Sequence, residues 1–295
     1  MPFVRDPTES LRRFWGLESA LVSPLGGGMN SRTWSVVHQG SAYVAKSVSS
    51  AGVADLLAGC QVATTLAEAG LVTGRPVPTR DGRLVVTDPA LALLEHVPGR
   101  ELDGDAHDEQ EWIANTLARV HAANSPTSGP GVATFAPDWL SPLMPGVAAH
   151  PWLPVAIETV RAETDPLIVT WSVLHTDPAP EAFIHDDRTG VTGLVDWAGA
   201  RRGPVLYDIA SAVMYLGGTQ HAAAFLARYQ SQGLLGVEEW LHIDVFRRFR
   251  EVVQGVYFAG RLAAPELTGV IDQAENEKGL FDARRRLAEL GIDSG

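Results

Sequence analysis

Two aspartates, Asp177 and Asp196, are the residues of this chain best suited to chemistry by type and spacing. They lie 19 positions apart, and each adjoins a short apolar run typical of a β-strand. Residues 186–190 between them have the composition of a turn. At such a spacing, one carboxylate can accept a proton while the other holds a cation. The pattern therefore indicates an active site built on two acids.

A hairpin is the element that would bring these acids together. If residues 182–185 pair with residues 192–195, Asp196 lies close to Glu181, and Asp177 is in the loop just before them. The alternative is a surface hairpin with solvated acids. That alternative is weakened by the apolar residues beside the acids, which we expect to be buried. They are Leu174, Phe183, Ile184, Leu194 and Val195.

The same stretch resembles a known family. The pattern is His-x-Asp, then a hairpin, then Asp-Trp, then Gly-x-x-x-x-Asp-Ile-Ala. It resembles the aminoglycoside phosphotransferase and choline kinase-like enzymes, which are small-molecule relatives of protein kinases. The resemblance is strong over residues 173–210 and moderate over residues 26–46. The matching residues are His175, Asp177, Asp196, Trp197, Gly203, Asp208, Ile209 and Ala210.

The resemblance implies a role for each acid. Asp177 would be the catalytic base, and Asp196 would hold Mg²⁺ on the nucleotide phosphates. Asp208 looks like the family's buried aspartate, which supports the catalytic loop. We expect His175 to pack and hold that loop, because an aspartate already occupies the position of the base.

One residue departs from the family pattern. The family places Asn, a ligand of the metal site, five residues after the base, where this chain has Ala182. A methyl group cannot coordinate a cation that prefers oxygen ligands. Three explanations stay open: water takes the position, neighbouring Glu181 substitutes, or efficient phosphoryl transfer is lost. Glu181 would need an irregular backbone, because adjacent strand residues point to opposite faces.

Three consecutive glycines, Gly26, Gly27 and Gly28, precede the strand-like residues 42–46, which end in Lys46. Glycines let backbone N–H groups approach phosphate oxygens closely. For an isolated triplet, the alternative is a plain flexible turn. Because Lys46 follows in the same strand-rich segment, we interpret the triplet as a phosphate-binding loop. By the resemblance, Lys46 contacts the α and β phosphates.

The carboxylate that should pair with this lysine is a second departure. Kinase-like enzymes carry it on the next helix. That helix is expected within residues 54–69, where Asp55, Gln61 and Glu68 are all candidates and none stands out.

Residues 83–87 and 91–97 have the pattern of paired strands. In the resembled family, this region is the hinge between two lobes, where backbone groups hydrogen-bond the adenine edge. Glu95, His96 and Val97 are therefore candidate purine contacts.

The resemblance implies an α+β, two-lobed protein-kinase-like fold. Residues 1–97 would form the nucleotide-binding N-lobe, with a small antiparallel sheet, and residues 98–295 a mainly helical C-lobe for catalysis and acceptor binding. The irregular residues 124–151 are expected to line the acceptor pocket. Apolar periodicity predicts helices at residues 11–21, 109–122, 209–216, 221–230, 238–252 and 280–290.

Composition limits the class of protein. The chain has 295 residues, of which 45% are hydrophobic and 20% charged, as in ordinary globular proteins. The single Cys60 excludes an internal disulfide framework. Residues 1–6 lack the apolar run of a signal peptide, and no apolar stretch approaches membrane-spanning length, so we expect a cytoplasmic protein with no membrane partner. The net charge of −12 argues against nucleic acid and favours a cationic small molecule.

Together these observations predict a kinase that uses Mg²⁺ and moves the γ-phosphoryl group of ATP, or GTP, to a hydroxyl of a small molecule. An antibiotic or amino sugar is the preferred acceptor, by charge and family analogy. Two other classes stay open. One is a pseudokinase that binds nucleotide without efficient turnover. The other is a metal-dependent hydrolase with His175, Asp177, His185 and Asp196 as ligands.

Overall fold

The computed structural model describes residues 6–26, 30–123, 127–130, 135, 137–264 and 272–292. These residues form two compact units. The first contains the described residues up to Leu102 together with Glu181–Arg201, and the second contains the other described residues. The second unit begins at Asp103 and does not include the segment Glu181–Arg201, and the division into an N-lobe of residues 1–97 and a C-lobe of residues 98–295 stays a prediction.

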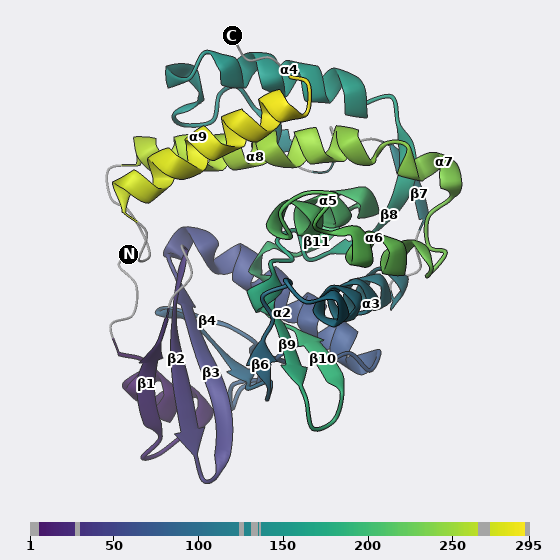
Figure 1. The fold of residues 1–295 in the computed structure, drawn as a ribbon. Coiled ribbons are helices and arrows are strands. Elements are labelled where there is room, and N and C mark those ends of the chain that lie inside the picture. The colour runs from purple at the N-terminus through teal and green to yellow at the C-terminus, as the bar shows by residue number, and fades with distance from the viewer. Residues whose placement is uncertain are drawn as a thin grey trace. The chain divides into compact units, whose positions relative to one another are not determined.

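The first unit is built on an antiparallel sheet with strand order β1-β2-β3-β5-β4 (Figure 1). Strands β2 and β3 are joined by Gln39 and Gly40, both with positive φ, as a two-residue hairpin turn requires. Alternate residues of β2, Trp34 and Val36, are buried in the core. The strands are β1 Leu21–Leu25, β2 Ser31–His38, β3 Ser41–Val48, β4 Val86–Thr87 and β5 Ala90–Glu95.

Helices cover parts of this unit. Residues Thr8–Ser10 (α1) and Leu11–Trp15 (η1) form a short helix that buries Leu11 and Trp15. It ends at Gly16, whose φ of 73° is left-handed, so the helix predicted for residues 11–21 is shorter than expected. A 3₁₀ turn at Ser50–Gly52 (η2) leads into α2, Val53–Glu68.

The predicted hairpin is present in the first unit. Strands β9 (Phe183–Asp186) and β10 (Val191–Leu194) pair antiparallel, with Phe183 opposite Leu194. Strand β6 (Arg100–Glu101) extends this sheet on the side of β9. The turn η7, Trp197–Gly199, follows β10, so the end of the hairpin continues directly through Asp196.

The second unit is mainly helical (Figure 1). Helix α4 packs on α8 at Gly255, where a Cβ would lie 2.7 Å from atoms of Trp152 and Leu153. Tyr207 of α5, Phe249 of α8 and Phe135 stack edge-on in the core. The helices are α3 His107–Ala123, α4 Trp152–Thr164, α5 Val205–Tyr215, α6 Ala223–Gln230, α7 Val237–Trp240, α8 Ile243–Ala263 and α9 Gln273–Glu289.

A small sheet of order β11-β8-β7 completes this unit. Its strands are β7 Thr127–Pro130, β8 Ile168–Leu174 and β11 Arg201–Pro204, and short 3₁₀ turns lie at Pro137–Leu140 (η4), Val147–Ala149 (η5) and Pro180–Ala182 (η6). The combination of an antiparallel sheet in one unit and helices in the other is the α+β class that was predicted. Among the described residues, no helix is both long and apolar enough to span a bilayer.

Candidate active site

Lys46 and Asp196 are brought together within the first unit, although they lie 150 positions apart in sequence. Lys46 lies in the C-terminal half of β3, opposite Thr33 and Ala92 on the neighbouring strands, and its side chain is buried. Its Nζ donates to Asp196 Oδ1. A buried ammonium group needs such a partner, because burial without one is costly. The Asp196 side chain is 55% exposed, so the carboxylate remains accessible.

The carboxylate that pairs with Lys46 in the described structure is therefore Asp196, not an acid of α2. On α2, Asp55 is exposed and Glu68 pairs with Arg75. Burial raises the pKa of Cys60 to about 11, and the charge of Lys46 partly offsets the rise. Lys46 thus acts electrostatically on a buried thiol of α2.

The backbone at Asp196 has an unusual conformation. Its φ of 69° is left-handed, which Asp tolerates better than most residues. The following Trp197 is anchored by two hydrogen bonds from its Nε1, to the carbonyl oxygens of Thr73 (3.2 Å) and Leu194 (2.9 Å). Helix α2 approaches so closely that a Cβ on Gly59 would lie 2.2 Å from the Trp197 oxygen. These contacts hold the turn that follows Asp196.

The predicted nucleotide contacts lie around the same sheet. Gly26 is exposed after β1, and its carbonyl accepts from Thr33 Oγ1 at 3.3 Å, while Gly27 and Gly28 lie outside the described residues. At the end of β5, the N–H of Glu95 donates to Arg75 O (2.9 Å) and that of His96 to Ala42 O (3.3 Å). Both of these backbone donors are therefore already bonded. A purine would have to use other groups of this segment, such as the Glu95 carbonyl or the backbone of Val97.

Glu181 and Ala182 lie in the turn η6, not in a strand. The alternation of side chains along a strand therefore does not apply to them. Glu181 is exposed, and the Ala182 carbonyl accepts from Val195 N at 2.9 Å. The register of the hairpin thus places position 182 next to Asp196, as the sequence predicted.

A divalent cation carried by a nucleotide fits this donor set. Mg²⁺ is commonly bound by one or two carboxylates, with phosphate and water oxygens as its other ligands, and Asp196 offers an accessible carboxylate. Within the described residues, no three His, Cys, Asp or Glu side chains are grouped to hold a metal by themselves.

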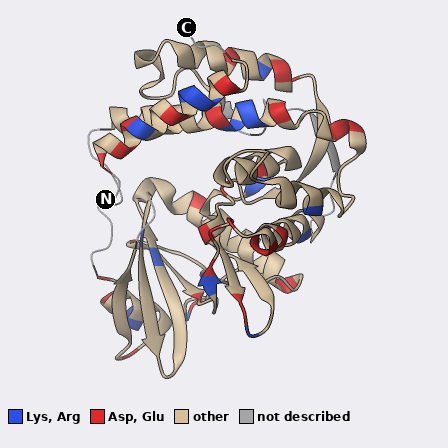
Figure 2. Cartoon of the chain, in the orientation of Figure 1, with Lys and Arg blue, Asp and Glu red and all other residues tan. Residues whose placement is uncertain are grey.

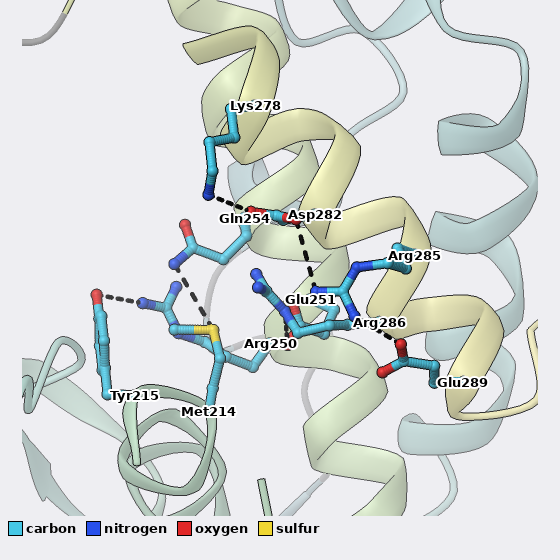
Figure 3. Close-up of polar contacts among 10 residues, drawn as sticks. All are labelled: Met214, Tyr215, Arg250, Glu251, Gln254, Lys278, Asp282, Arg285, Arg286 and Glu289. Atoms are coloured by element: carbon cyan, nitrogen blue, oxygen red, sulfur yellow. Dashed lines mark hydrogen bonds and ion pairs between the residues drawn. The ribbon is translucent and has the colours of Figure 1, made fainter. Parts of the chain in front are cut away.

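Asp177 lies in the second unit, just after β8, and one of its oxygens is anchored. Arg250 Nη2 donates to Asp177 Oδ1 at 2.7 Å, and the Tyr215 hydroxyl donates to the same oxygen. Arg250 Nη2 also donates to the Tyr215 hydroxyl at 3.2 Å (Figure 3). The Arg250 side chain is only 6% exposed, whereas that of Asp177 is 62% exposed. The carboxylate is held from the protein side and open toward solvent.

Arg250 keeps its charge in this buried position. Burial lowers its pKa, but Tyr207, Tyr215, Asp177 and Glu251 raise it further, so the net shift is upward. Its guanidinium carbon lies 5.8 Å and 5.7 Å from the ring centres of Tyr207 and Tyr215. Arg250 and Tyr215 are not among the residues that the sequence singled out. Arg250 lies in a run with the charged residues Arg247, Arg248 and Glu251, so no local signal distinguished it.

Asp208 of α5 is fully buried beneath the loop that carries Asp177. It accepts from the N–H groups of His175 (2.7 Å) and Thr176 (2.8 Å), and His121 Nε2 lies 3.1 Å away. The φ of Thr176 is 74°, a conformation that costs a β-branched residue about 1–3 kcal/mol. The two hydrogen bonds to Asp208 offset that strain. His121 Nδ1 lies 2.5 Å from the Tyr229 hydroxyl, which extends the network.

Comparison with known proteins decides the family. Residues 21–245 match the family model described as the phosphotransferase enzyme family. The chain belongs to this family. A comparison with curated proteins found no match. The family resemblance seen in the sequence is thereby confirmed.

Solved structures of similar fold are small-molecule kinases by title. An amicoumacin kinase in complex with AMP-PNP and Ca²⁺ matches with a TM-score of 0.74 at 13% identity, covering 96% of this chain and 92% of that one. A microcompartment-associated aminopropanol kinase matches with a TM-score of 0.68 at 16% identity, and the match covers 97% of this chain and 98% of that one. The choline kinase LicA from Streptococcus pneumoniae matches with a TM-score of 0.69 at 18% identity, and the match covers 96% of this chain and 97% of that one. At such identities the likeness shows the fold, and the predicted two-lobed kinase-like α+β fold is confirmed.

Family membership also confirms the predicted class of enzyme. The chain is a phosphotransferase by family. The acceptor, the nucleotide and the metal are not decided by membership, because such features are properties of individual sites on a shared fold.

Proposed function

We propose that this phosphotransferase uses ATP and a divalent cation, Mg²⁺ in the cell, to phosphorylate a hydroxyl group of a small molecule. The observation that carries the proposal is the contact between Lys46 and Asp196, which places a buried cation and an accessible carboxylate side by side in the first unit. The amicoumacin kinase of similar fold was solved with an ATP analogue and Ca²⁺, which supports an adenine nucleotide with a divalent ion over GTP.

In the proposed mechanism, Lys46 leaves Asp196 to bind the α and β phosphates, and Asp196 then faces the metal. Asp196 would hold the Mg²⁺, which would supply positive charge against the charge that develops on the phosphates. Asp177 accepts the proton of the acceptor hydroxyl through Oδ2, because Oδ1 is held by Arg250 and Tyr215. The acceptor oxygen bonds to the γ-phosphorus as the bond to the β–γ bridging oxygen breaks, and ADP leaves.

Further positions complete the proposed nucleotide site. Gly26 and its two neighbouring glycines approach the phosphates, and the segment Glu95–Val97 contacts the purine through the backbone groups that remain available. Glu181 or a water supplies the metal ligand that Ala182 lacks. Asp208 positions the loop of His175 and Thr176 through its two backbone hydrogen bonds.

Two variants with opposite signatures test this function. Asp177→Asn keeps the shape of the side chain but removes proton acceptance, so turnover should fall by roughly 10²–10⁴-fold while nucleotide binding persists. Asp196→Ala should weaken Mg²⁺-nucleotide binding far more than metal-free nucleotide binding, since the lost group acts through the cation. Calorimetry with AMP-PNP, with and without Mg²⁺, and an ATP-consumption assay measure both effects. Full activity of Asp177→Asn, or equal wild-type affinity with and without Mg²⁺, would contradict the assignment.

A further inference from the structure

Among the described residues, Lys46 forms a single ion pair, with Asp196. The Lys46 side chain is 9% exposed, so its ammonium group is held away from most of the solvent. A cation in such a place is stable only beside an anion, because an unpaired buried charge costs far more free energy than a paired one. Lys46 can therefore leave Asp196 only if another anion takes its place.

Helix α2 packs next to Lys46 but offers it no second carboxylate. The helix contacts Ala92, the residue opposite Lys46 on β5. Figure 2 shows α2 mostly in tan, since Asp55 and Glu68 are its only charged residues. Asp55 is exposed, and Glu68 belongs to another ion pair. The helix that could hold the lysine permanently thus leaves it to Asp196.

Cys60 of α2 lies within electrostatic reach of Lys46, but it is not an anion. Burial raises the pKa of its thiol to about 11, although the charge of Lys46 acts in the opposite direction. The thiol therefore stays neutral at physiological pH. The described part of this unit gives Lys46 no anion other than Asp196, so the phosphates of a nucleotide are the natural replacement.

Either ligand by itself would leave one charge of the pair without a partner. A divalent cation alone at Asp196 would displace Lys46 and leave its ammonium group buried and unpaired. Mg²⁺ also usually needs phosphate oxygens beside its one or two carboxylates. A nucleotide alone would pair Lys46 with phosphates but leave the Asp196 carboxylate facing a polyanion. Only the nucleotide and the cation together pair every charge.

We propose that the ion pair between Lys46 and Asp196 is exchanged when ligands bind, so that the divalent cation binds together with the nucleotide and not to the free chain. The inference rests on the proposed function, because it states how the proposed nucleotide site is loaded. Binding linkage is reciprocal, so the cation and the nucleotide must raise each other's affinity for the chain by the same factor.

The composition of the chain permits a direct observation of Lys46. Lys46 and Lys278 are the only lysines, so a chain with ¹³C-labelled lysine gives two side-chain signals in NMR. Lys278 is exposed on α9 and serves as the internal control, and Lys278→Arg assigns the signals. Metal-free AMP-PNP should shift the signal of Lys46 only, and Mg²⁺ alone at millimolar concentration should shift neither. A Lys46 signal that moves with Mg²⁺ alone, or stays with AMP-PNP, would overturn the inference.

Asp196→Asn separates the two ligands by the sign of its effect. The amide keeps the size of the side chain but removes its charge, so Lys46 can bind phosphates without breaking an ion pair. Metal-free AMP-PNP should therefore bind at least about 10-fold more tightly than to the wild type, and Mg²⁺–AMP-PNP at least about 10-fold more weakly. Asp55→Asn removes the same charge from an exposed position of α2 and should change neither affinity.

Calorimetry on the full chain measures these affinities, and thermal melting checks that both variants fold. Unchanged or weaker binding of metal-free AMP-PNP to Asp196→Asn would contradict the exchange. If that variant unfolds, the lysine signals of the wild type decide.

Failure of this inference is distinguishable from failure of the proposed function. Mg²⁺-dependent nucleotide binding and phosphoryl transfer, without tighter binding of metal-free AMP-PNP to Asp196→Asn, keep the function and overturn the exchange. No binding of AMP-PNP to the wild type, with or without Mg²⁺, overturns both.

Discussion

At the scale of the residue, Asp177 is a carboxylate whose two oxygens are in different environments. Oδ1 is bonded by Arg250 and Tyr215, and the side chain is otherwise largely exposed. A base held in this way has a fixed direction in which it can meet a hydroxyl group. A fixed geometry raises the rate of phosphoryl transfer strongly, because catalysis of this reaction depends mainly on positioning and electrostatics. Arg250 is therefore a positioning residue, since it acts through Asp177.

Arg250→Ala should lower kcat by about 10²-fold, the effect of a misplaced catalytic group, and leave the KM for nucleotide unchanged. Added guanidinium ion should restore part of kcat, because the deleted group is the one supplied. Arg248→Ala on the same helix, which removes the ion pair with Glu163, is the control and should show no rescue. Steady-state kinetics with and without guanidinium make the comparison. Loss of nucleotide affinity, or equal rescue of both variants, would point to a general structural role.

Ala182 offers a second test at this scale. Ala182→Asn supplies a side-chain oxygen next to Asp196, so activity should rise or stay level and the Mg²⁺ requirement should shift to lower concentration. Glu181→Gln should be damaging if Glu181 is the substitute ligand and nearly neutral if water takes that role. Mg²⁺ titrations of activity distinguish the two. If no acceptor is phosphorylated and neither variant alters Mg²⁺-dependent nucleotide binding, the pseudokinase alternative is correct.

At the scale of the element, the position of Asp196 depends on the packing of α2 against η7. Gly59 permits this approach, because any side chain at that position would meet the backbone of Trp197 and Ala198. The hydrogen bonds of the Trp197 indole hold the turn from its other side. A helix that carries no carboxylate for Lys46 thus still contributes to the site, by fixing the turn that carries Asp196.

Gly59→Ala should destabilise the fold by about 1–3 kcal/mol, the usual cost of overpacking, and weaken Mg²⁺-nucleotide binding by displacing η7. Gly260→Ala is the matched control in helix α8, because a Cβ there meets its nearest atom at an ordinary 3.6 Å. It should be neutral or stabilising by about 0.5–1 kcal/mol, as alanine is favoured over glycine inside helices. Thermal and urea unfolding measure both variants. A neutral Gly59→Ala would show that the turn relaxes without cost.

At the scale of the whole molecule, the chain forms its first unit from two distant parts of the sequence. Glu181–Arg201 joins the N-terminal residues, so the pairing of Lys46 with Asp196 is formed inside one compact unit. Asp177 and the network of Asp208, His121 and Tyr229 belong to the other unit. Each unit thus holds one of the two carboxylates that the sequence singled out, each with its own supporting contacts.

The sequence by itself determined the local features of this protein. The alternation of apolar residues beside two acids predicted the hairpin and its register, and the His-x-Asp and Asp-Trp patterns led to the family. Turn residues and apolar periodicity are local signals, so the elements that they indicate can be predicted without the tertiary structure. Helix ends were less readable, since Gly16 ended the first helix earlier than periodicity indicated.

Only the tertiary structure decided which charges meet. Lys46 pairs with Asp196 and not with an acid of α2, and Arg250 reaches Asp177 across 73 positions. No local pattern encodes these partners, because ion pairs form between whichever groups the packing of distant elements brings together. The sequence identifies which residues can do chemistry, and the fold determines which of them contact one another.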